Sequence, residues 1–325
     1  MKERTSQVVS GDVVVQLVGG LGNQMFQYAS ALALAQARGS KLWLDTRALP
    51  LLAQRKNVTP RSLEIFDFQI TAGIPTGVDL DSWGLDWRVL PPSASWIPGR
   101  LWLFAQRAAL SVSPPGFKIY SEPSLDFDPG WSAHTTGDQG LYLKGFWQSE
   151  NYFSNLRRQL IAEFVPSSPL SPELASLRQQ ITDQRSLVVH IRRGDLVNNR
   201  KARGFHGLLP VDYYRSAINS MRQRVDSESI LVFTDDENWC KSHLRSIQDL
   251  TVIQGSDYPG NSAQHLYTMS AGSAFVIANS SFSWWAAWLS GVSGEHIAAP
   301  EPWFAQAEAP NGPVPTSWCK IPVVI

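Results

Sequence analysis

The stretch that decides the fold is VVVQLVGGLGNQMFQYASALALAQARGSKLWLD, residues 13–45. It opens with the apolar, β-branched run 13–18, which ends in Gly19-Gly20 and predicts a buried strand. From about Gln24 the apolar residues recur at helical spacing as far as Gly39, a natural helix stop. The run 42–45 predicts a second strand. The order of strand, glycine-rich turn, helix and strand indicates a βαβ unit with parallel strands.

The rest of the chain divides at a stretch rich in Pro and Ser, residues 165–172, which is typical of a linker. Before it, residues 46–135 show no sustained period and predict loops and short helices, followed by a strand at 141–148 and a helix at 155–164. After it, a helix is expected at 210–225, among strands at 187–191, 230–233, 251–253, 275–278 and 297–299. We therefore predict an α/β protein of two Rossmann-like domains, with parallel sheets that face an interdomain cleft. Residues 1–165 would form the first domain and 166–325 the second, and the C-terminal tail is a candidate to pack back on the first domain.

Composition excludes several classes of protein. The 28 basic and 28 acidic residues balance, so no global field favours nucleic acid or an anionic membrane. The polar opening contains no secretion signal, and no apolar run is long enough to span a membrane. Cys240 and Cys319 fit no zinc spacing and are interpreted as reduced thiols. We expect a cytoplasmic protein with at most peripheral membrane contact, for which residues 83–110, rich in Trp, Leu and Arg, are the candidate. The alternative is that these residues cover an interior face.

The turn at residues 19–24 has the composition of a ligand-binding turn. It is not the dinucleotide fingerprint, because the third glycine position falls on Met25, and it lacks the Lys-Ser/Thr of a phosphate loop. It places Asn23 and Gln24 at a helix N-terminus, where unpaired N–H groups attract anions. The alternative is a plain strand-to-helix turn with an Asn cap.

The stretch HIRRGD, residues 190–195, ends a predicted strand, where ligands of α/β sheets bind. Two permanently charged guanidinium groups, on Arg192 and Arg193, suit a diphosphate. The alternative is a structural ion pair with Asp195. The nearby Arg200, Lys201 and Arg203 are interpreted as a solvated face.

Two further strand ends carry polar side chains. Residues 278–285, ANSSFSWW, pass from strand into helix, and their serines and N–H groups could bind another part of an anionic ligand. The Trp residues there, with Trp288, are interpreted as core. In FTDD, residues 233–236, Asp235 or Asp236 could bind a ribose or a guanine, or else cap the helix expected at 237–244. Together these stretches predict a nucleotide-diphosphate site that faces a cleft.

Several of these motifs resemble the α-1,2-fucosyltransferase family, which is glycosyltransferase family 11-like. The matching stretches are GGLGNQMFQYASALALA (19–35), GFWQSENYF (145–153), HIRRGD (190–195), LPVDYY (209–214), FTDD (233–236) and IANSSFSWWAAWLS (277–290). The Gly-Asn-Gln turn at 22–24 is also similar to that of protein O-fucosyltransferases. The resemblance implies a GT-B fold with GDP-fucose bound by the C-terminal half. The chain departs from the family at Ala286, where Gly is usual, and the segment 79–118 does not align.

The resemblance also implies roles for single residues. Arg192 would hold the β-phosphate, Asn23 would face the reacting sugar, and Asp195 would complete the catalytic set. The implied donor pocket consists of Gly20, Gly22, Asn23, His190, Arg192, Arg193, Asp195, Asp235, Asp236, Asn279, Ser280, Ser281 and Phe282.

The implied activity is inverting transfer of fucose from GDP-fucose to the 2-hydroxyl of a terminal galactose, on an oligosaccharide or a lipid-linked glycan. No cofactor or metal is expected, because two arginines would make a divalent cation redundant, and Asp126-Phe127-Asp128 is interpreted as a loop. Asp195 and Glu150 are candidate bases for the acceptor hydroxyl. The alternatives are another fucose linkage, another nucleotide sugar, a metal-dependent single-domain transferase, and a non-catalytic glycan-binding protein on the same fold.

Overall fold

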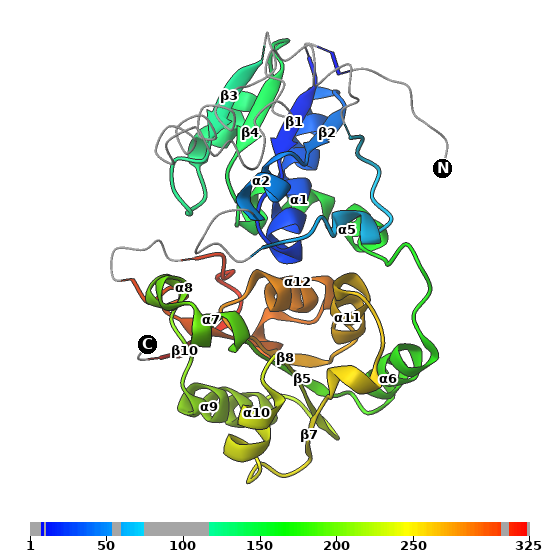
Figure 1. Cartoon of the computed structure of the whole chain (residues 1–325), viewed down its shortest axis with the longest axis vertical. Coiled ribbons are helices and arrows are strands. Elements are labelled where there is room, and N and C mark those ends of the chain that lie inside the picture. The colour runs from blue at the N-terminus through cyan, green and yellow to red at the C-terminus, as the bar shows by residue number, and fades with distance from the viewer. Residues whose placement is uncertain (1–7, 10, 54–59, 75–116, 307–311, 324–325) are drawn as a thin grey trace, which may run out of the picture. The chain divides into compact units, whose positions relative to one another are not determined.

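The structure is a computed structural model that describes residues 8–9, 11–53, 60–74, 117–306 and 312–323. Most of the Trp-rich segment 79–118 lies outside the described residues. The chain divides into two compact units (Figure 1), the first of residues 1–63 and 71–157 and the second of residues 64–70 and 158–325. The expected boundary after residue 165 differs from this division, because residues 64–70 and the stretch around 165–167 belong together. Phe68 bridges Pro166, and the N–H of Ser167 donates to the carbonyl of Asp67 at 2.7 Å.

The first unit has a four-stranded parallel sheet in the order β2-β1-β4-β3. Its strands are β1 (Val13–Gln16), β2 (Leu42–Asp45), β3 (Lys118–Ser121) and β4 (Leu141–Lys144). Its helical segments are α1 (Leu21–Arg38), α2 (Ala48–Ala53), η3 (Pro129–His134), η4 (Glu150–Tyr152) and η5 (Ser154–Leu156). The predicted βαβ unit is therefore confirmed, and β3 is a strand that the sequence analysis did not expect.

Helix α1 starts and stops at glycines. Gly20 is its N-cap, and the helix begins at Leu21, three residues before the expected start at Gln24. At the other end Gly39 is left-handed, with φ of 64°, and its N–H bonds back to the carbonyls of Ala35 and Gln36. A glycine meets this backbone demand without a steric cost. All residues from Leu21 to Ala35 except Asn23 are buried, so α1 lies in the interior of this unit.

The second unit has a six-stranded parallel sheet in the order β10-β9-β8-β5-β6-β7. Its strands are β5 (Leu187–Ile191), β6 (Ile230–Thr234), β7 (Leu250–Val252), β8 (Ala274–Val276), β9 (Ile297–Glu301) and β10 (Cys319–Pro322). Its α-helices are α5 (Arg157–Glu163), which begins at the division, α6 (Pro172–Asp183), α7 (Gly194–Asn198), α8 (Arg200–His206), α9 (Val211–Arg222), α10 (Glu237–His243), α11 (Ser262–Met269) and α12 (Ser281–Ser290). Short 3-10 turns are η1 (Ile65–Asp67), η6 (Gly255–Asp257) and η7 (Gly294–His296). The C-terminal tail, a candidate to pack on the first domain, supplies β10 to this sheet.

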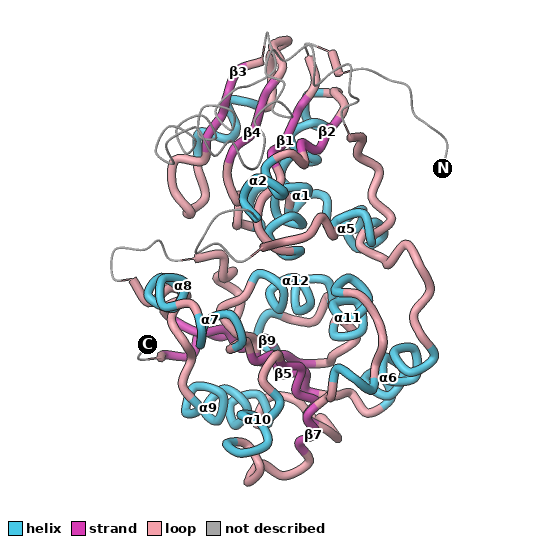
Figure 2. Tube along the Cα trace, viewed as in Figure 1, coloured by secondary structure: helices cyan, strands magenta, loops and turns pink. Residues whose placement is uncertain are grey.

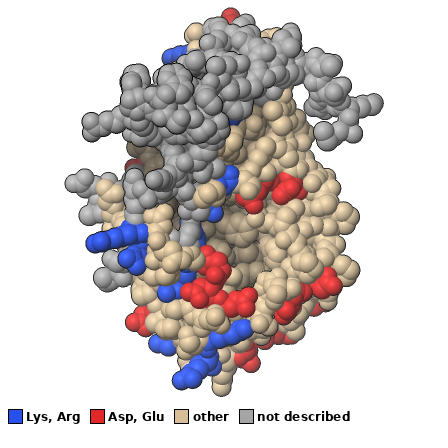
Figure 3. All heavy atoms as spheres, viewed as in Figure 1, with Lys and Arg blue, Asp and Glu red and all other residues tan. Residues whose placement is uncertain are grey.

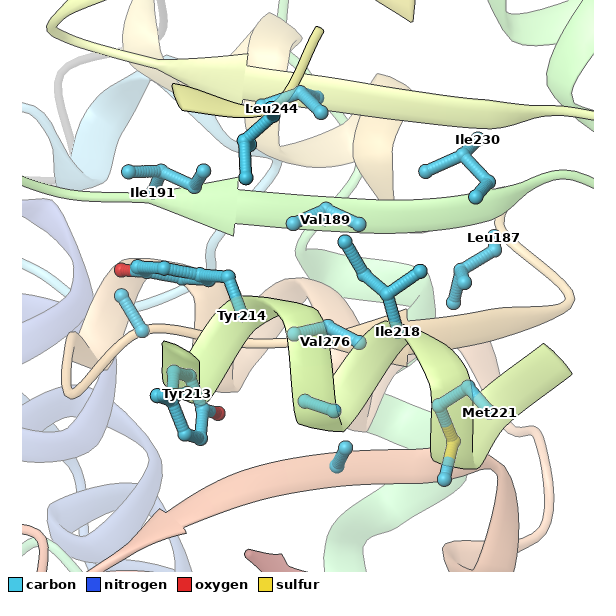
Figure 4. Packing of buried hydrophobic residues seen from close by; sticks show 14 of the residues in the cluster. Leu187, Val189, Ile191, Tyr213, Tyr214, Ile218, Met221, Ile230, Leu244 and Val276 are labelled. Atoms are coloured by element: carbon cyan, nitrogen blue, oxygen red, sulfur yellow. The ribbon is translucent and has the colours of Figure 1, made fainter. Parts of the chain in front are cut away.

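Helices cover both faces of this sheet, with α9 and α10 on one face and α11 and α12 on the other (Figure 2). On the first face, Ile218 and Met221 of α9 lie against Leu187, Val189 and Val276 of the central strands (Figure 4). Burial on both faces explains why the strands are nearly continuous apolar runs. Two α/β units with parallel sheets confirm the predicted fold class, and the cleft between them stays a prediction.

Four other expectations can be compared with the structure. Trp284, Trp285 and Trp288 are at most 2% exposed, which confirms that they are core residues. The two cysteines form no disulfide. Basic and acidic side chains both appear on the face drawn in Figure 3, in keeping with their equal totals. No described helix combines the length and the apolar character that crossing a membrane requires.

Candidate functional site

The candidate site lies where the strand order of the second sheet reverses. The chain runs outward from β5 through β6 and β7, then returns to the other side of β5 and continues outward through β8, β9 and β10. Ligands of parallel α/β sheets bind beyond the carboxyl ends of the strands at such a reversal. The predicted site stretches 190–195, 235–236 and 279–282 follow β5, β6 and β8, which are neighbours in the sheet. The fold therefore brings these three stretches to one edge.

His190 connects the two sides of the reversal. It lies in β5, and its ring centroid is 5.7 Å from that of Phe282 in the first turn of α12. Burial, and secondly the Arg192 guanidinium, lower the pKa of His190 from its ordinary 6.5 to about 3. Its imidazole is therefore neutral at physiological pH. The buried Nδ1 has no hydrogen-bond partner within the described ranges, and the neutral ring brings no charge to this edge of the sheet.

The two adjacent arginines have different surroundings. Arg193 donates from Nε to Asp236 at 3.1 Å, and its guanidinium lies 4.1 Å from the centre of the Trp239 ring. Its side chain is 13% exposed, so this pair is largely shielded from water. Arg192, by contrast, is close enough to His190 to act on its pKa. Arg193 is thus paired and stacked within this unit, and a joint grip of both arginines on a diphosphate stays a prediction.

The two aspartates after β6 support the neighbouring loop and helix. Asp235 accepts the backbone N–H of Arg193 at 2.7 Å, and its carboxylate lies so close to Gly194 that an added Cβ would stand 3.0 Å from Oδ2. Asp236 caps α10, accepting the N–H of Trp239 at 3.1 Å. The helix-cap alternative is thus confirmed for Asp236. A contact of Asp235 with ribose or guanine stays a prediction.

The N-terminus of α12 is the part of the edge best suited to an anion. Ser280 is its N-cap, makes no side-chain cap bond, and no acidic residue occupies the first turn. The helix dipole and the first N–H groups favour negative charge there. Asn279, 2% exposed, donates to the carbonyls of His206 at 2.5 Å and Trp303 at 3.3 Å. Its buried Oδ1 has no hydrogen-bond partner among the described atoms.

The glycine-rich turn of the first unit is shaped by Gly19. Its φ of 81° is left-handed, and an added Cβ would lie 2.4 Å from Asn23 Nδ2. Gly20 and Gly22, the predicted site glycines, have no positive φ, and Gly22 is buried in the first turn of α1. The Asn-cap alternative is wrong, because the N-cap is Gly20. The Asn23 side chain instead accepts a hydrogen bond at 2.8 Å from Gln148, in the loop after β4.

Other candidate residues have varied positions. The side chains of Asp195 and Lys201 lie outside what the structure describes, whereas Arg200 and Arg203 are exposed, as expected of a solvated face. Residues 126–128 are a loop, as predicted, and Asp128 caps η3. Within the described ranges no three His, Cys, Asp or Glu side chains are grouped to hold a metal ion.

Sequence reasoning missed three participants. Trp239 stacks on Arg193, Glu122 accepts the backbone N–H groups of Phe146 and Trp147 at 2.7 Å each, and Gln148 bonds Asn23. Only Gln148 had a signal in the sequence, because it lies within the quoted stretch GFWQSENYF.

Comparison with known proteins identifies the family. The model of "Glycosyl transferase family 11" matches residues 132–313, more than half of the chain. An Escherichia coli protein named alpha-1,2-colitosyltransferase is 32% identical over 317 residues, covering 95% of this chain and 98% of its own length. The O-antigen biosynthesis glycosyltransferase WbnK of Escherichia coli is 28% identical, with coverages of 89% and 94%.

A galactoside alpha-(1,2)-fucosyltransferase 1 of Leontocebus fuscicollis is 25% identical over 89% of this chain and 68% of its own length. Among solved structures, the NodZ alpha-1,6-fucosyltransferase soaked with GDP-fucose is similar with a TM-score of 0.42 and 16% identity, covering 86% of this chain and 92% of that one. The family match covers more than half of the chain, and the 32% identical relative covers 95% of it. The chain belongs to glycosyl transferase family 11 and is a glycosyltransferase.

Proposed function

We propose that this chain is an inverting α-1,2-fucosyltransferase that moves fucose from GDP-fucose to the 2-hydroxyl of a terminal galactose on a glycan. The observation that carries the proposal is the meeting of Arg192, neutral His190 and the N-terminus of α12 at the reversal between β5 and β8. The names of family relatives, which include a galactoside alpha-(1,2)-fucosyltransferase, support the choice of sugar and linkage.

In this proposal the diphosphate of the donor binds at the edge formed by β5 and α12. Arg192 holds the β-phosphate with its guanidinium fork. Ser280, Ser281 and the first N–H groups of α12 bind other phosphate oxygens. His190 adds one hydrogen bond without adding charge, and Asp235 binds the ribose or the guanine.

The reaction replaces one bond at the anomeric carbon. The acceptor hydroxyl attacks from the face opposite the diphosphate and loses its proton, and the bond between the anomeric carbon and the β-phosphate oxygen breaks. Negative charge grows on that phosphate oxygen, so Arg192 binds the transition state more strongly than the intact donor. In this scheme Asn23 contacts the transferred sugar. The proton goes to a carboxylate, for which Asp195 and Glu150 are the candidates.

The proposal is tested by binding titrations with GDP, UDP and ADP and by a matched pair of arginine variants. Arg192→Ala should lower kcat by about 10²–10³-fold, the usual effect of losing one such contact. Arg193→Ala removes the same charge, but the Arg193 side chain is held by Asp236 and Trp239. This variant should therefore lower the free energy of unfolding more than it lowers kcat. Mass spectrometry of products from GDP-fucose and galactose-terminated oligosaccharides identifies the linkage. Tighter binding of UDP than GDP, or turnover by Arg192→Ala at the wild-type rate, would contradict the proposal.

Metal independence is part of the proposal and has its own test. If Arg192 and the α12 N-terminus neutralise the diphosphate, activity should survive excess EDTA. Loss of activity in EDTA, restored by a divalent cation, would contradict this.

A second donor is favoured by one observation. The relative that is 32% identical over 95% of this chain is named for colitose. Colitose is fucose without its 3-hydroxyl, so the same diphosphate grip would serve both sugars. Competition between GDP-fucose and GDP-colitose in one reaction decides which donor has the higher kcat/KM.

A further inference from the structure

The first sheet also reverses its strand order, and one hydrogen bond crosses that reversal. The chain runs from β1 outward to β2, then returns so that β4 lies on the other side of β1 and β3 beyond it. Asn23 follows the carboxyl end of β1, and Gln148 follows that of β4. Their side chains meet, with Gln148 Nε2 donating to Asn23 Oδ1 at 2.8 Å. This contact lies at the edge where such sheets position functional groups.

The loop that carries Gln148 is held from two directions. Glu122, just after β3, accepts the backbone N–H groups of Phe146 and Trp147 at 2.7 Å each. From α1, Gln27 donates to the carbonyl of Gly145 at 2.9 Å. Trp147 itself has a left-handed φ of 56° and a fully buried side chain. The three residues before Gln148 are therefore held in place by contacts from Glu122 and from α1.

The hydrogen bond from Gln148 determines which edge of the Asn23 carboxamide faces Gln148 and which faces away from it. A carboxamide has one accepting edge and one donating edge. With Oδ1 turned to Gln148, the donating Nδ2 occupies the other edge, next to Gly19, where an added Cβ would be 2.4 Å away. The leaving phosphate oxygen carries no proton to give, and it accepts hydrogen bonds more strongly as negative charge grows on it in the transition state. A donor is the useful edge for such a centre.

We propose that Gln148 is a positioning residue that orients Asn23 so that its NH₂ group, and not its oxygen, faces the reacting sugar. This inference rests on the proposed function, because that function places Asn23 at the transferred sugar. Gln148 acts only through Asn23, and Glu122 acts through the loop that carries Gln148.

The sharpest test is Gln148→Glu. A carboxylate of the same length can only accept, so it would bind Nδ2 and turn Oδ1 toward the substrate. We expect kcat to fall by about 10- to 100-fold, the equivalent of one hydrogen bond to a charged group, with GDP affinity unchanged. Gln148→Ala, which removes the orientation without reversing it, should lose less. The control Gln139→Glu adds the same charge at an exposed position of this unit and should keep the wild-type kcat.

Asn23→Asp tests the same inference in case Gln148→Glu does not fold. In Asn23→Asp, Gln148 can still donate to one carboxylate oxygen, and the other oxygen presents an acceptor. Its kcat should be at least as low as that of Asn23→Ala. If Gln148→Glu and Asn23→Asp, both folded by circular dichroism, keep wild-type kcat, the proposal is overturned.

A spectroscopic measurement separates this inference from the proposed function. In protein labelled with ¹⁵N-asparagine, Gln148→Glu should shift the Nδ2 resonance of Asn23, because the carboxylate at position 148 becomes the partner of Nδ2. An unchanged resonance would overturn the inference even without an activity assay. A wild-type chain that yields no product from GDP-fucose would count against the proposed function and leave this measurement valid.

Discussion

Replacing Gly19 by Ala should damage both stability and catalysis, and Gly39→Ala provides the matched control. Both glycines flank α1 and have left-handed φ angles, 81° and 64°. A Cβ on Gly39 would meet nothing within 4 Å, whereas one on Gly19 would lie 2.4 Å from Asn23 Nδ2 and 3.0 Å from Asn23 Cβ. Gly39→Ala therefore measures the backbone cost alone, and Gly19→Ala adds the displacement of Asn23.

The two costs can be estimated separately. A non-glycine residue in the left-handed region costs about 1–2 kcal/mol, which is the expected loss for Gly39→Ala. Moving Asn23 also breaks its hydrogen bond with Gln148, which is worth about 0.5–1.5 kcal/mol. Gly19→Ala should then cost about 1.5–3.5 kcal/mol in the free energy of unfolding.

Urea unfolding followed by tryptophan fluorescence measures the stability loss, and initial rates with GDP-fucose measure kcat. Gly39→Ala should be destabilised and keep the kcat of the wild type. Gly19→Ala should lose more stability and have a lower kcat, because Asn23 is displaced from the edge of the sheet. Equal stability losses together with full activity of Gly19→Ala would refute the close packing of Asn23 on Gly19.

Three further outcomes are expected. Asp236→Asn can still cap α10 but loses its charge pair with Arg193, so it should lower the free energy of unfolding by about 0.5–1 kcal/mol in urea. Asp236→Ala loses both the cap and the charge pair and should lower it by about 1–3 kcal/mol. Equal losses for the two variants would contradict the dual role of Asp236. Glu122→Gln can accept only one of the two loop N–H groups and should lower the free energy of unfolding by about 1–3 kcal/mol; a neutral substitution would argue against that contact. Because the pKa of His190 is lowered in the folded state, the unfolded chain binds a proton first as pH falls, so this residue removes stability between about pH 6.5 and about pH 3. Thermal melting of His190→Asn should show a smaller acid loss than the wild type, and identical pH profiles would contradict this.

The local hydrophobic pattern of the sequence predicted the helices and strands that are buried and regular. The stretch 13–45 and the apolar strands of the second half became strands and helices close to the expected bounds, because buried parallel strands and long helices leave a periodic pattern. Strand β3 was missed because it is an edge strand whose residues are mostly exposed, so no apolar alternation marks it. The expected strand 141–148 ends at Lys144, since the following N–H groups bond to Glu122, which no local pattern could indicate.

The amino-acid sequence by itself determined the α/β class, the clustering of charged and polar residues after β5, β6 and β8, and the resemblance to one enzyme family. Only the tertiary structure decided which of those residues already make side-chain contacts within the protein. Arg193 is paired with an aspartate 43 positions away, and Asn23 is oriented by a glutamine 125 positions away. Such contacts depend on which strand ends become neighbours in the sheet.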